Sequence, residues 1–168
     1  MRWLFLAGMA VVTGTIFARE APPVSALPAA QVQQQVLELV NQARAQGQLC
    51  GAERFGPALP VLLSAQLHRA ARIHARDMAK RNYFEHEGSD GSAPRDRVQR
   101  AGYRFRLTGE NIAFGPESAA EVVSGWLASA GHCANLMNPH FRHMGVAVAQ
   151  GSKRGHFYWV QELGAPAP

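Results

Sequence analysis

The longest informative stretch of the chain is Trp126-Leu127-Ala128-Ser129-Ala130-Gly131-His132-Cys133-Ala134-Asn135-Leu136-Met137. Its first residues continue an apolar pattern with helical spacing that includes Val122 and Val123. Gly131 interrupts that pattern, and the residues after it are typical of a further short helical turn. The stretch therefore predicts a helix over residues 118–130 and a second helical turn over residues 131–136.

The segments on either side complete an α+β pattern. Apolar residues recur at helical spacing over residues 30–46 and 61–82, and Pro94 suits the first turn of a short helix over residues 94–102. Residues 103–117 break the pattern, and we expect them to form a loop. The period changes to two over residues 144–149 and 157–162, which predicts an antiparallel hairpin. Helices first and a hairpin last indicate an α+β layer architecture.

Three shorter strings accompany the first one: Tyr83-Phe84-Glu85-His86, Gly109-Glu110-Asn111-Ile112-Ala113 and Tyr158-Trp159-Val160-Gln161. In this order the four strings resemble the CAP superfamily of cysteine-rich secretory, antigen 5 and pathogenesis-related proteins, and most of all its bacterial secreted branch. Asn41 and Arg44 match the Asn-x-x-Arg of the family's first helix. The resemblance spans about residues 31–164. It implies a three-layer α-β-α sandwich with an antiparallel central sheet and a large central cleft.

The resemblance also implies that His86, Glu110 and His132 line that cleft. Two imidazoles and one carboxylate are suitable zinc ligands, so the three residues are a candidate metal site. The family's eukaryotic members often carry a second glutamate at the position of Ser129, which puts coordination by four residues in doubt. The alternative is a hydrogen-bonded polar cleft without a metal, in which Asn111 and Asn135 tie the surrounding loops together.

Two other functions are open at this point. A hydrolase acting on cell-envelope peptides would use Ser129 as nucleophile, His132 as base and Glu110 as the group that orients the imidazole. Neither a Gly-x-Ser-x-Gly elbow nor a His-Glu-x-x-His helix is found in the sequence, which disfavours catalysis. The resemblance implies lipid or sterol binding by some family members, although Val32, Leu63 and Val122 are interpreted here as core residues.

The N-terminus predicts export. Residues 1–18 combine a positively charged start, an uncharged apolar run and small residues at a possible cleavage site, which is the pattern of a secretory signal peptide. The alternative is an N-terminal membrane anchor that is not cleaved. Residues 19–30 are rich in Pro and Ala and are expected to be a flexible lead-in to a single domain over residues 31–164, with a tail at 165–168. We expect a secreted or periplasmic monomer with an extracellular or envelope ligand and no membrane span after signal removal.

Two cysteines, Cys50 and Cys133, support the same compartment. An even pair in an exported protein is interpreted first as a disulfide, here closing a loop of roughly 84 residues worth about 4–5 kcal/mol in the chain-entropy model. The alternative is two free thiols, with Cys133 reactive beside His132.

The formal charge of +5 is carried mostly by scattered arginines, among them Arg72, Arg76, Arg97 and Arg100. No basic motif with interleaved aromatic residues accompanies them, so nucleic-acid binding is not expected. The arginines are interpreted as a solvated surface. His74 falls on the apolar face of the second helix and is expected to be a hydrogen-bonded core residue.

Overall fold

The computed structural model describes residues 24–153 and 155–168, so the predicted signal peptide lies outside the described residues. The helices are α1 (Ala29–Gln46), α2 (Ala65–Arg81), α3 (Pro94–Arg100), α4 (Ala119–Ala128) and α5 (Ala130–Met137). A short 3-10 helix, η1 (Val24–Ala26), precedes them. The strands are β1 (Gln48–Cys50), β2 (Glu53–Phe55), β3 (Leu62–Leu63), β4 (Phe105–Phe114), β5 (His143–Gln150) and β6 (Phe157–Pro166).

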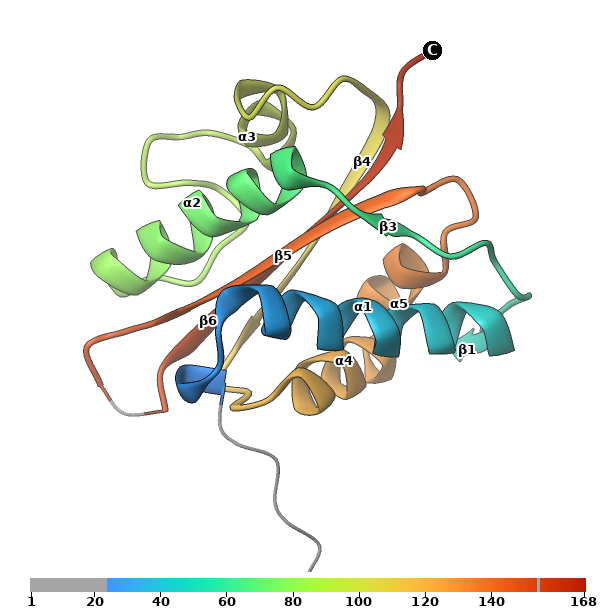
Figure 1. Cartoon of the computed structure of the whole chain (residues 1–168), viewed down its shortest axis with the longest axis horizontal. Coiled ribbons are helices and arrows are strands. Elements are labelled where there is room, and N and C mark those ends of the chain that lie inside the picture. The colour runs from blue at the N-terminus through green and yellow to red at the C-terminus, as the bar shows by residue number, and fades with distance from the viewer. Residues whose placement is uncertain (1–23, 154) are drawn as a thin grey trace, which may run out of the picture.

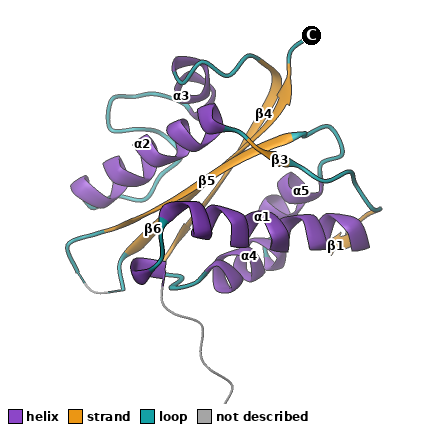
Figure 2. Cartoon of the chain, in the orientation of Figure 1, coloured by secondary structure: helices purple, strands orange, loops and turns teal. Residues whose placement is uncertain are grey.

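A four-stranded sheet in the order β3-β5-β6-β4 separates two helical layers (Figure 1). Helices α2 and α3 lie on one face, and α1, α4 and α5 lie on the other, as the colouring by secondary structure also shows (Figure 2). Strands β5, β6 and β4 are antiparallel, as predicted for the central sheet, whereas the two-residue β3 runs parallel to β5. The α+β sandwich is therefore confirmed.

The two faces of the sheet are packed differently. Alternate residues of β6 point to opposite faces, so Trp159 and Leu163 join a large core with α1 and α4, and Tyr158 and Val160 join a smaller one with α2. Gly145 of β5 lets α2 approach closely, because a Cβ at this position would collide with the backbone of Leu67 and His68.

The predicted loop over residues 103–117 is wrong, because ten of these residues form β4. This strand pairs with β6 along its whole length, from Phe105↔Pro166 to Phe114↔Tyr158. Its centre does not show an apolar alternation, because Glu110 and Asn111 are polar and yet buried. The helix predicted over residues 61–82 begins only at Ala65, where the Ser64 hydroxyl caps it by accepting from the Leu67 N–H.

Other boundaries also differ from the predictions. The predicted lead-in packs against the domain from Val24 onward, since Val24 is buried and its N–H donates to the Glu117 carbonyl. Strand β6 continues through Pro166 into the predicted tail. Leu63, interpreted as a core residue, lies in β3 and is 40% exposed. Within the described residues, no helix is long and apolar enough to cross a bilayer.

The disulfide between Cys50 and Cys133 is confirmed, with a Cα–Cα distance of 5.3 Å. It joins β1 to α5 across a sequence separation of 83 residues. Both cysteines are buried with Met137 in a small apolar cluster, so neither offers a free thiol.

Candidate functional site

The site is organised around β4, which is one of the two edge strands of the four-stranded sheet. Successive side chains of a strand point to opposite faces, so Glu110 faces α2 and α3 while Asn111 faces α5. His86 comes from the loop between α2 and α3, and His132 comes from the first turn of α5. The candidate site therefore lies across the edge strand, with one histidine contributed from each side of the sheet. We call His86, Glu110, Arg97 and His132 the His86 site.

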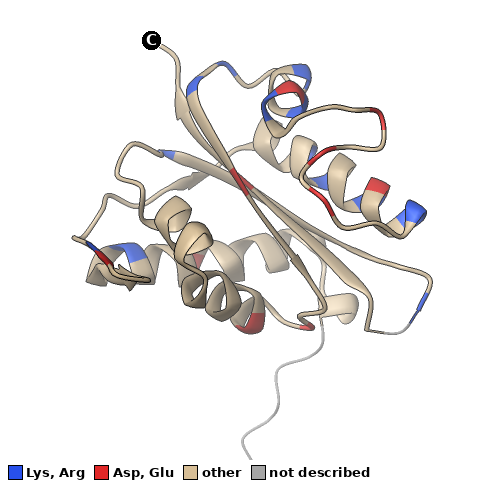
Figure 3. Ribbon diagram, turned by 180° about the vertical axis from the view of Figure 1, so that it is seen from behind, with Lys and Arg blue, Asp and Glu red and all other residues tan. Residues whose placement is uncertain are grey.

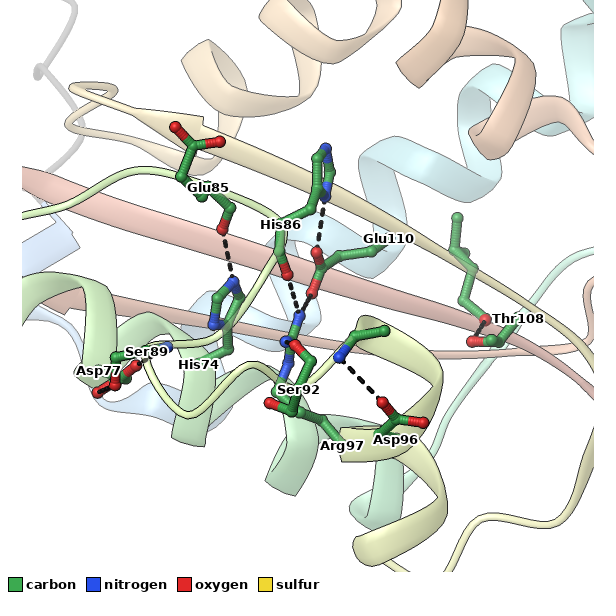
Figure 4. Close-up of polar contacts among 12 residues, drawn as sticks. His74, Asp77, Glu85, His86, Ser89, Ser92, Asp96, Arg97, Thr108 and Glu110 are labelled. Atoms are coloured by element: carbon green, nitrogen blue, oxygen red, sulfur yellow. Dashed lines mark hydrogen bonds and ion pairs between the residues drawn. The ribbon is translucent and has the colours of Figure 1, made fainter.

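His86 and Glu110 are joined directly (Figure 4). The His86 Nδ1 lies 2.7 Å from the Glu110 Oε1, and the His86 side chain is 53% exposed whereas that of Glu110 is only 2% exposed. The hydrogen bond to Glu110 raises the pKa of His86 above its ordinary value, although partial burial opposes this effect. A buried carboxylate thus orients a half-exposed imidazole, and the second ring nitrogen is left for a ligand.

Arg97 holds the other side of Glu110. Its Nη2 donates to the Glu110 Oε2 at 2.6 Å and to the His86 carbonyl at 2.8 Å, and its Nη1 donates to the Ser92 carbonyl at 2.7 Å. Burial alone would raise the pKa of Glu110, but the His86 hydrogen bond and the positive charge of Arg97 more than offset it, so the pKa is lowered. Glu110 is therefore a carboxylate whose two oxygens are both already bound by side chains of the site.

The loop that carries His86 is tied down by four further hydrogen bonds. His74 lies on α2 with 1% of its surface exposed, and its Nε2 bonds the Glu85 carbonyl at 2.9 Å, as expected of a core histidine. Asp77 accepts from the Ser89 N–H and hydroxyl and from the Tyr83 hydroxyl. Figure 4 shows His74 beside Glu85, and Asp77 beside Ser89. The loop is thereby fixed on both sides of His86.

Asn111 and Asn135 connect the edge strand to α5. The Asn135 Nδ2 donates to the Asn111 Oδ1 at 2.9 Å and to the Glu110 carbonyl at 3.2 Å, while the Asn111 Nδ2 donates to the His132 carbonyl at 3.3 Å and to the Gln161 side chain at 3.0 Å. These bonds cover backbone groups on the open edge of β4. They also fix the turn of α5 that carries His132.

His132 differs electrostatically from His86. Its pKa is lowered, first by burial and then by the positive charge that His86 can carry. The two imidazoles are thus close enough to influence one another. Since a metal binds only a neutral imidazole, a lowered pKa favours the ligand form of His132 at neutral pH.

Ser129, the nucleophile of the hydrolase alternative, lies at the junction of α4 and α5. It is the extended residue between α4 and α5, with φ −97° and ψ 122°, rather than a position on a helical turn. No hydrogen bond joins its hydroxyl to His132 among the contacts of the described chain. Ser129 separates the two helices, and the Cys133 N–H donates to its carbonyl at 2.8 Å.

Nor do the three predicted metal ligands form a complete coordination group. Over residues 24–153 and 155–168, the structure contains no cluster of three or more His, Cys, Asp or Glu side chains that could hold a metal ion. The chemical reason is that Arg97 and His86 occupy the oxygens of Glu110. The donor set that remains for a metal is two imidazoles.

Two residues of this region were not singled out from the sequence. Arg97 was interpreted as part of a solvated basic surface, which is wrong, because its side chain is only 5% exposed. Glu162 lies opposite Glu110 on β6 and is fully buried. Glu162 continues the face of β6 that carries Tyr158 and Val160, and a charged residue on an apolar strand face was the available signal.

Charged side chains concentrate on this half of the molecule. In Figure 3 most of the coloured segments lie on α2, α3 and the loop between them, whereas α4 and α5 are largely tan. A hollow of about 390 Å³ lies there between α2 and the segment from Gly88 to Arg100, and it is lined by His74 and Arg97 together with exposed cations such as Arg76. A second, apolar hollow of about 330 Å³ lies on the opposite layer, between α1 and α4.

Comparison with known proteins adds independent findings. Residues 37–163 match the family model described as CAP, the cysteine-rich secretory protein family. The uncharacterized protein YkwD of Bacillus subtilis is 34% identical over 117 residues, which are 69% of this chain and 44% of YkwD. The chain therefore spans less than half the length of that relative.

Solved structures are similar as well. An extracellular SCP-domain protein from Bacillus anthracis superposes with a TM-score of 0.67 and 29% identity, over 81% of this chain and 41% of that protein. The crystal structure of NaASP2 with Zn2+ superposes with a TM-score of 0.57 and 17% identity, over 82% of this chain and 80% of that one. At 17% identity, the similarity to NaASP2 shows a shared fold and nothing more.

Proposed function

The chain belongs to the CAP family, and on that basis we propose that it is an exported binding domain whose His86 site takes a divalent metal such as zinc. In this proposal His86 and His132 are the ligands, and Glu110 orients His86 without touching the metal. The observation that carries the proposal is the 2.7 Å bond between the buried Glu110 carboxylate and the Nδ1 of the half-exposed His86.

The donor set fits such an ion. Metal-bound histidines usually donate their second ring N–H to a carboxylate or carbonyl, which fixes the tautomer and makes the imidazole a better ligand. Glu110 plays that part for His86, and the lowered pKa of His132 keeps its imidazole neutral near pH 7. Two protein ligands leave further coordination positions for water or for a bound molecule, and a bound zinc would supply Lewis acidity there. The Zn2+ in the NaASP2 structure is consistent with this choice of probe.

Export is supported by the chemistry of the cysteines. A disulfide between Cys50 and Cys133 persists only in an oxidising compartment, and the similar Bacillus anthracis protein is described as extracellular. The signal peptide expected over residues 1–18 would deliver the chain to that compartment. Fractionation of expressing cells, followed by mass measurement of the mature N-terminus, tests both points.

Zinc binding is tested by calorimetric titration of the oxidised domain at about pH 7.5 and about pH 5.5. We expect binding at the higher pH that weakens on acidification, because the raised pKa of His86 favours its protonated form as the pH falls. His86→Ala and His132→Ala should each abolish it. Glu110→Gln should weaken it by roughly 10- to 100-fold, as expected of a group outside the coordination shell.

His140→Ala is the matched control, because His140 is exposed and its only side-chain partner among the described contacts is Arg106. The proposal fails if His86→Ala and His132→Ala bind zinc as the parent protein does. It also fails if His140→Ala is the variant that loses binding.

Binding of a fatty-acyl chain is a second candidate, favoured by the hollow between α1 and α4. Its lining combines the apolar Leu27, Leu39, Ala119 and Ala120 with the polar Gln35, Glu38, Gln42 and Ser118. Leu39→Arg would place a charge in that hollow and should remove uptake of a fluorescent fatty acid by the delipidated domain. Equal uptake by the parent and the variant would reject this candidate.

A further inference from the structure

Glu162 is a buried acidic residue that the proposed function does not use. It lies in the middle of β6, opposite Glu110 on β4 and opposite Gly145 on β5. None of its surface is exposed, and neither of its carboxyl oxygens has a hydrogen-bond partner among the described residues. A fully buried, unpartnered carboxylate is costly, so this side chain needs a physical explanation.

The strand register brings the two glutamates together. Glu110 and Glu162 are direct cross-strand partners, so their side chains point to the same face of the sheet and leave it side by side. Helix α2 closes this face from above, because Gly145 allows the backbone at Leu67 and His68 to lie directly on the sheet next to Glu162. Water therefore cannot separate or solvate the pair from that side.

Two adjacent carboxylates have only acceptors and cannot bond one another, whereas a carboxylic acid beside a carboxylate has one donor and one acceptor. Glu110 is the group that stays ionised, because it receives hydrogen bonds from His86 and Arg97. Burial, together with the negative charge and contact of Glu110, raises the pKa of Glu162 well above its ordinary value, and Arg97 only partly opposes this. The charged groups that act on Glu162 are thus Glu110 from β4 and Arg97 from α3.

We propose that Glu162 is a neutral carboxylic acid that donates a hydrogen bond to the Glu110 carboxylate and so acts as a positioning residue for the His86 site. The Glu110 carboxylate then has three donors: Glu162 from β6, Arg97 from α3 and His86 from the loop. Three donors from three elements fix the plane of the carboxylate and turn its Oε1 towards His86. Arg97 balances the negative charge of Glu110, and Glu110 holds only the Nδ1 of His86, so the other ring nitrogen of His86 stays open.

The role of Glu162 in positioning the His86 site rests on the proposed function. The hydrogen bond from Glu162 to Glu110 itself does not, because it needs no ligand. Infrared spectroscopy of the metal-free oxidised domain at about pH 7 tests it directly, since exposed Asp and Glu side chains are ionised at that pH. We expect the C=O absorption of one protonated carboxylic acid in the parent protein. Glu162→Gln should abolish that band while the domain stays folded, because the amide N–H can replace the donor to Glu110.

Two further variants separate the explanations. Glu38→Gln, on the exposed surface of α1, is the matched control and should leave the band unchanged. Glu110→Gln should keep the band but shift it to higher frequency, because an amide oxygen is a weaker acceptor than a carboxylate. The proposal is overturned if the parent protein lacks the band or if the band survives Glu162→Gln. It is also overturned if Glu110→Gln leaves the frequency of the band unchanged.

The outcome is independent of the zinc titration. A protein that shows the band and binds no zinc leaves the Glu162–Glu110 pair standing and rejects only the proposed function. A protein that binds zinc through His86 and His132 but lacks the band rejects only the pair.

Discussion

Two buried arginines, one in each helical layer, show how differently the two halves of this molecule are built. Arg44 of α1 is completely buried and bonds only backbone carbonyls: Leu59 at 2.8 Å, Leu136 at 2.5 Å, Asn138 at 3.1 Å and Phe141 at 3.3 Å. Arg97 of α3 bonds two carbonyls and a carboxylate, that of Glu110. The first arginine ties loops together, and the second is part of a titratable network.

The surroundings of each arginine match this difference. Arg44 lies in the layer that contains the largest apolar core and the disulfide, and burial together with the nearby Arg142 lowers its pKa only to about 10, so it stays charged at any ordinary pH. Arg97 lies among His74, His86 and Glu110, whose protonation can change. One layer should therefore supply stability that does not depend on pH, and the other should link stability to the charge state of the site.

The largest expected effect is on the Arg44 layer, through the disulfide. Replacing Cys50 and Cys133 together by Ala should lower the free energy of unfolding by about 4–5 kcal/mol, because the closed loop spans a sequence separation of 83 residues. The loss should be the same at pH 5 and pH 7, since the two cysteines are buried in an apolar cluster with Met137. Urea denaturation of oxidised, reduced and doubly substituted protein measures it, and a loss below 1 kcal/mol would contradict the assignment of stability to this layer.

The second effect separates the two arginines. Arg97→Met should cost roughly 3–5 kcal/mol at pH 7, because it leaves the buried Glu110 carboxylate without its cation. The pKa of Glu110 is depressed in the folded protein, so the stability that its ionised form contributes is present above the unfolded value and is lost as the pH falls. The cost of Arg97→Met should therefore shrink as the pH falls below the unfolded value near 4.5 and the depressed pKa of Glu110 is approached.

Arg44→Met is the matched control for this experiment. It removes hydrogen bonds to four carbonyls and should cost about 2–3 kcal/mol, since buried acceptors lose their donors. No carboxylate is left behind, so the cost should not change between pH 4 and pH 7. If the two variants show the same pH profile in denaturant titrations, the distinction between the layers is wrong.

The sequence predicts the two layers unequally for the same reason. Helix α1 and the β5–β6 hairpin follow from periodicity. The buried face of α1 is apolar at helical spacing, and β5 and β6 are paired strands that follow one another in the chain. Strand β4 does not, because Glu110 and Asn111 replace apolar residues at its centre and its partner β6 lies about fifty residues away. Its polar centre is the site itself.

The site residues divide in a similar way. His86, Glu110 and His132 were predicted through the family resemblance, and the structure brings Glu110 against His86. Arg97 and Glu162 were not singled out, because the burial of a charged side chain depends on partners from distant elements; the position of Glu162 on an apolar face of β6 was the one available signal. Only the register Glu110↔Glu162 makes the role of Glu162 apparent.

The smallest predicted effect concerns Asp77, which anchors the loop before α3. Its titration adds to the pH dependence of stability in the layer that contains Arg97. Burial alone would raise the pKa of Asp77, but hydrogen bonds from the Tyr83 hydroxyl, the Ser89 hydroxyl and N–H, and the Arg81 guanidinium outweigh it and lower the pKa to about 2. A depressed pKa means that the stabilisation is complete above the unfolded value near 3.8 and is lost as the pH falls towards 2. Because the side chain is a quarter exposed, Asp77→Asn should cost only about 1 kcal/mol at pH 7 and almost nothing near pH 2. Hydrogen exchange at the Ser89 amide should rise in this variant while exchange in α1 stays constant; equal rises in both places would mean that the loop and the Arg44 layer unfold together.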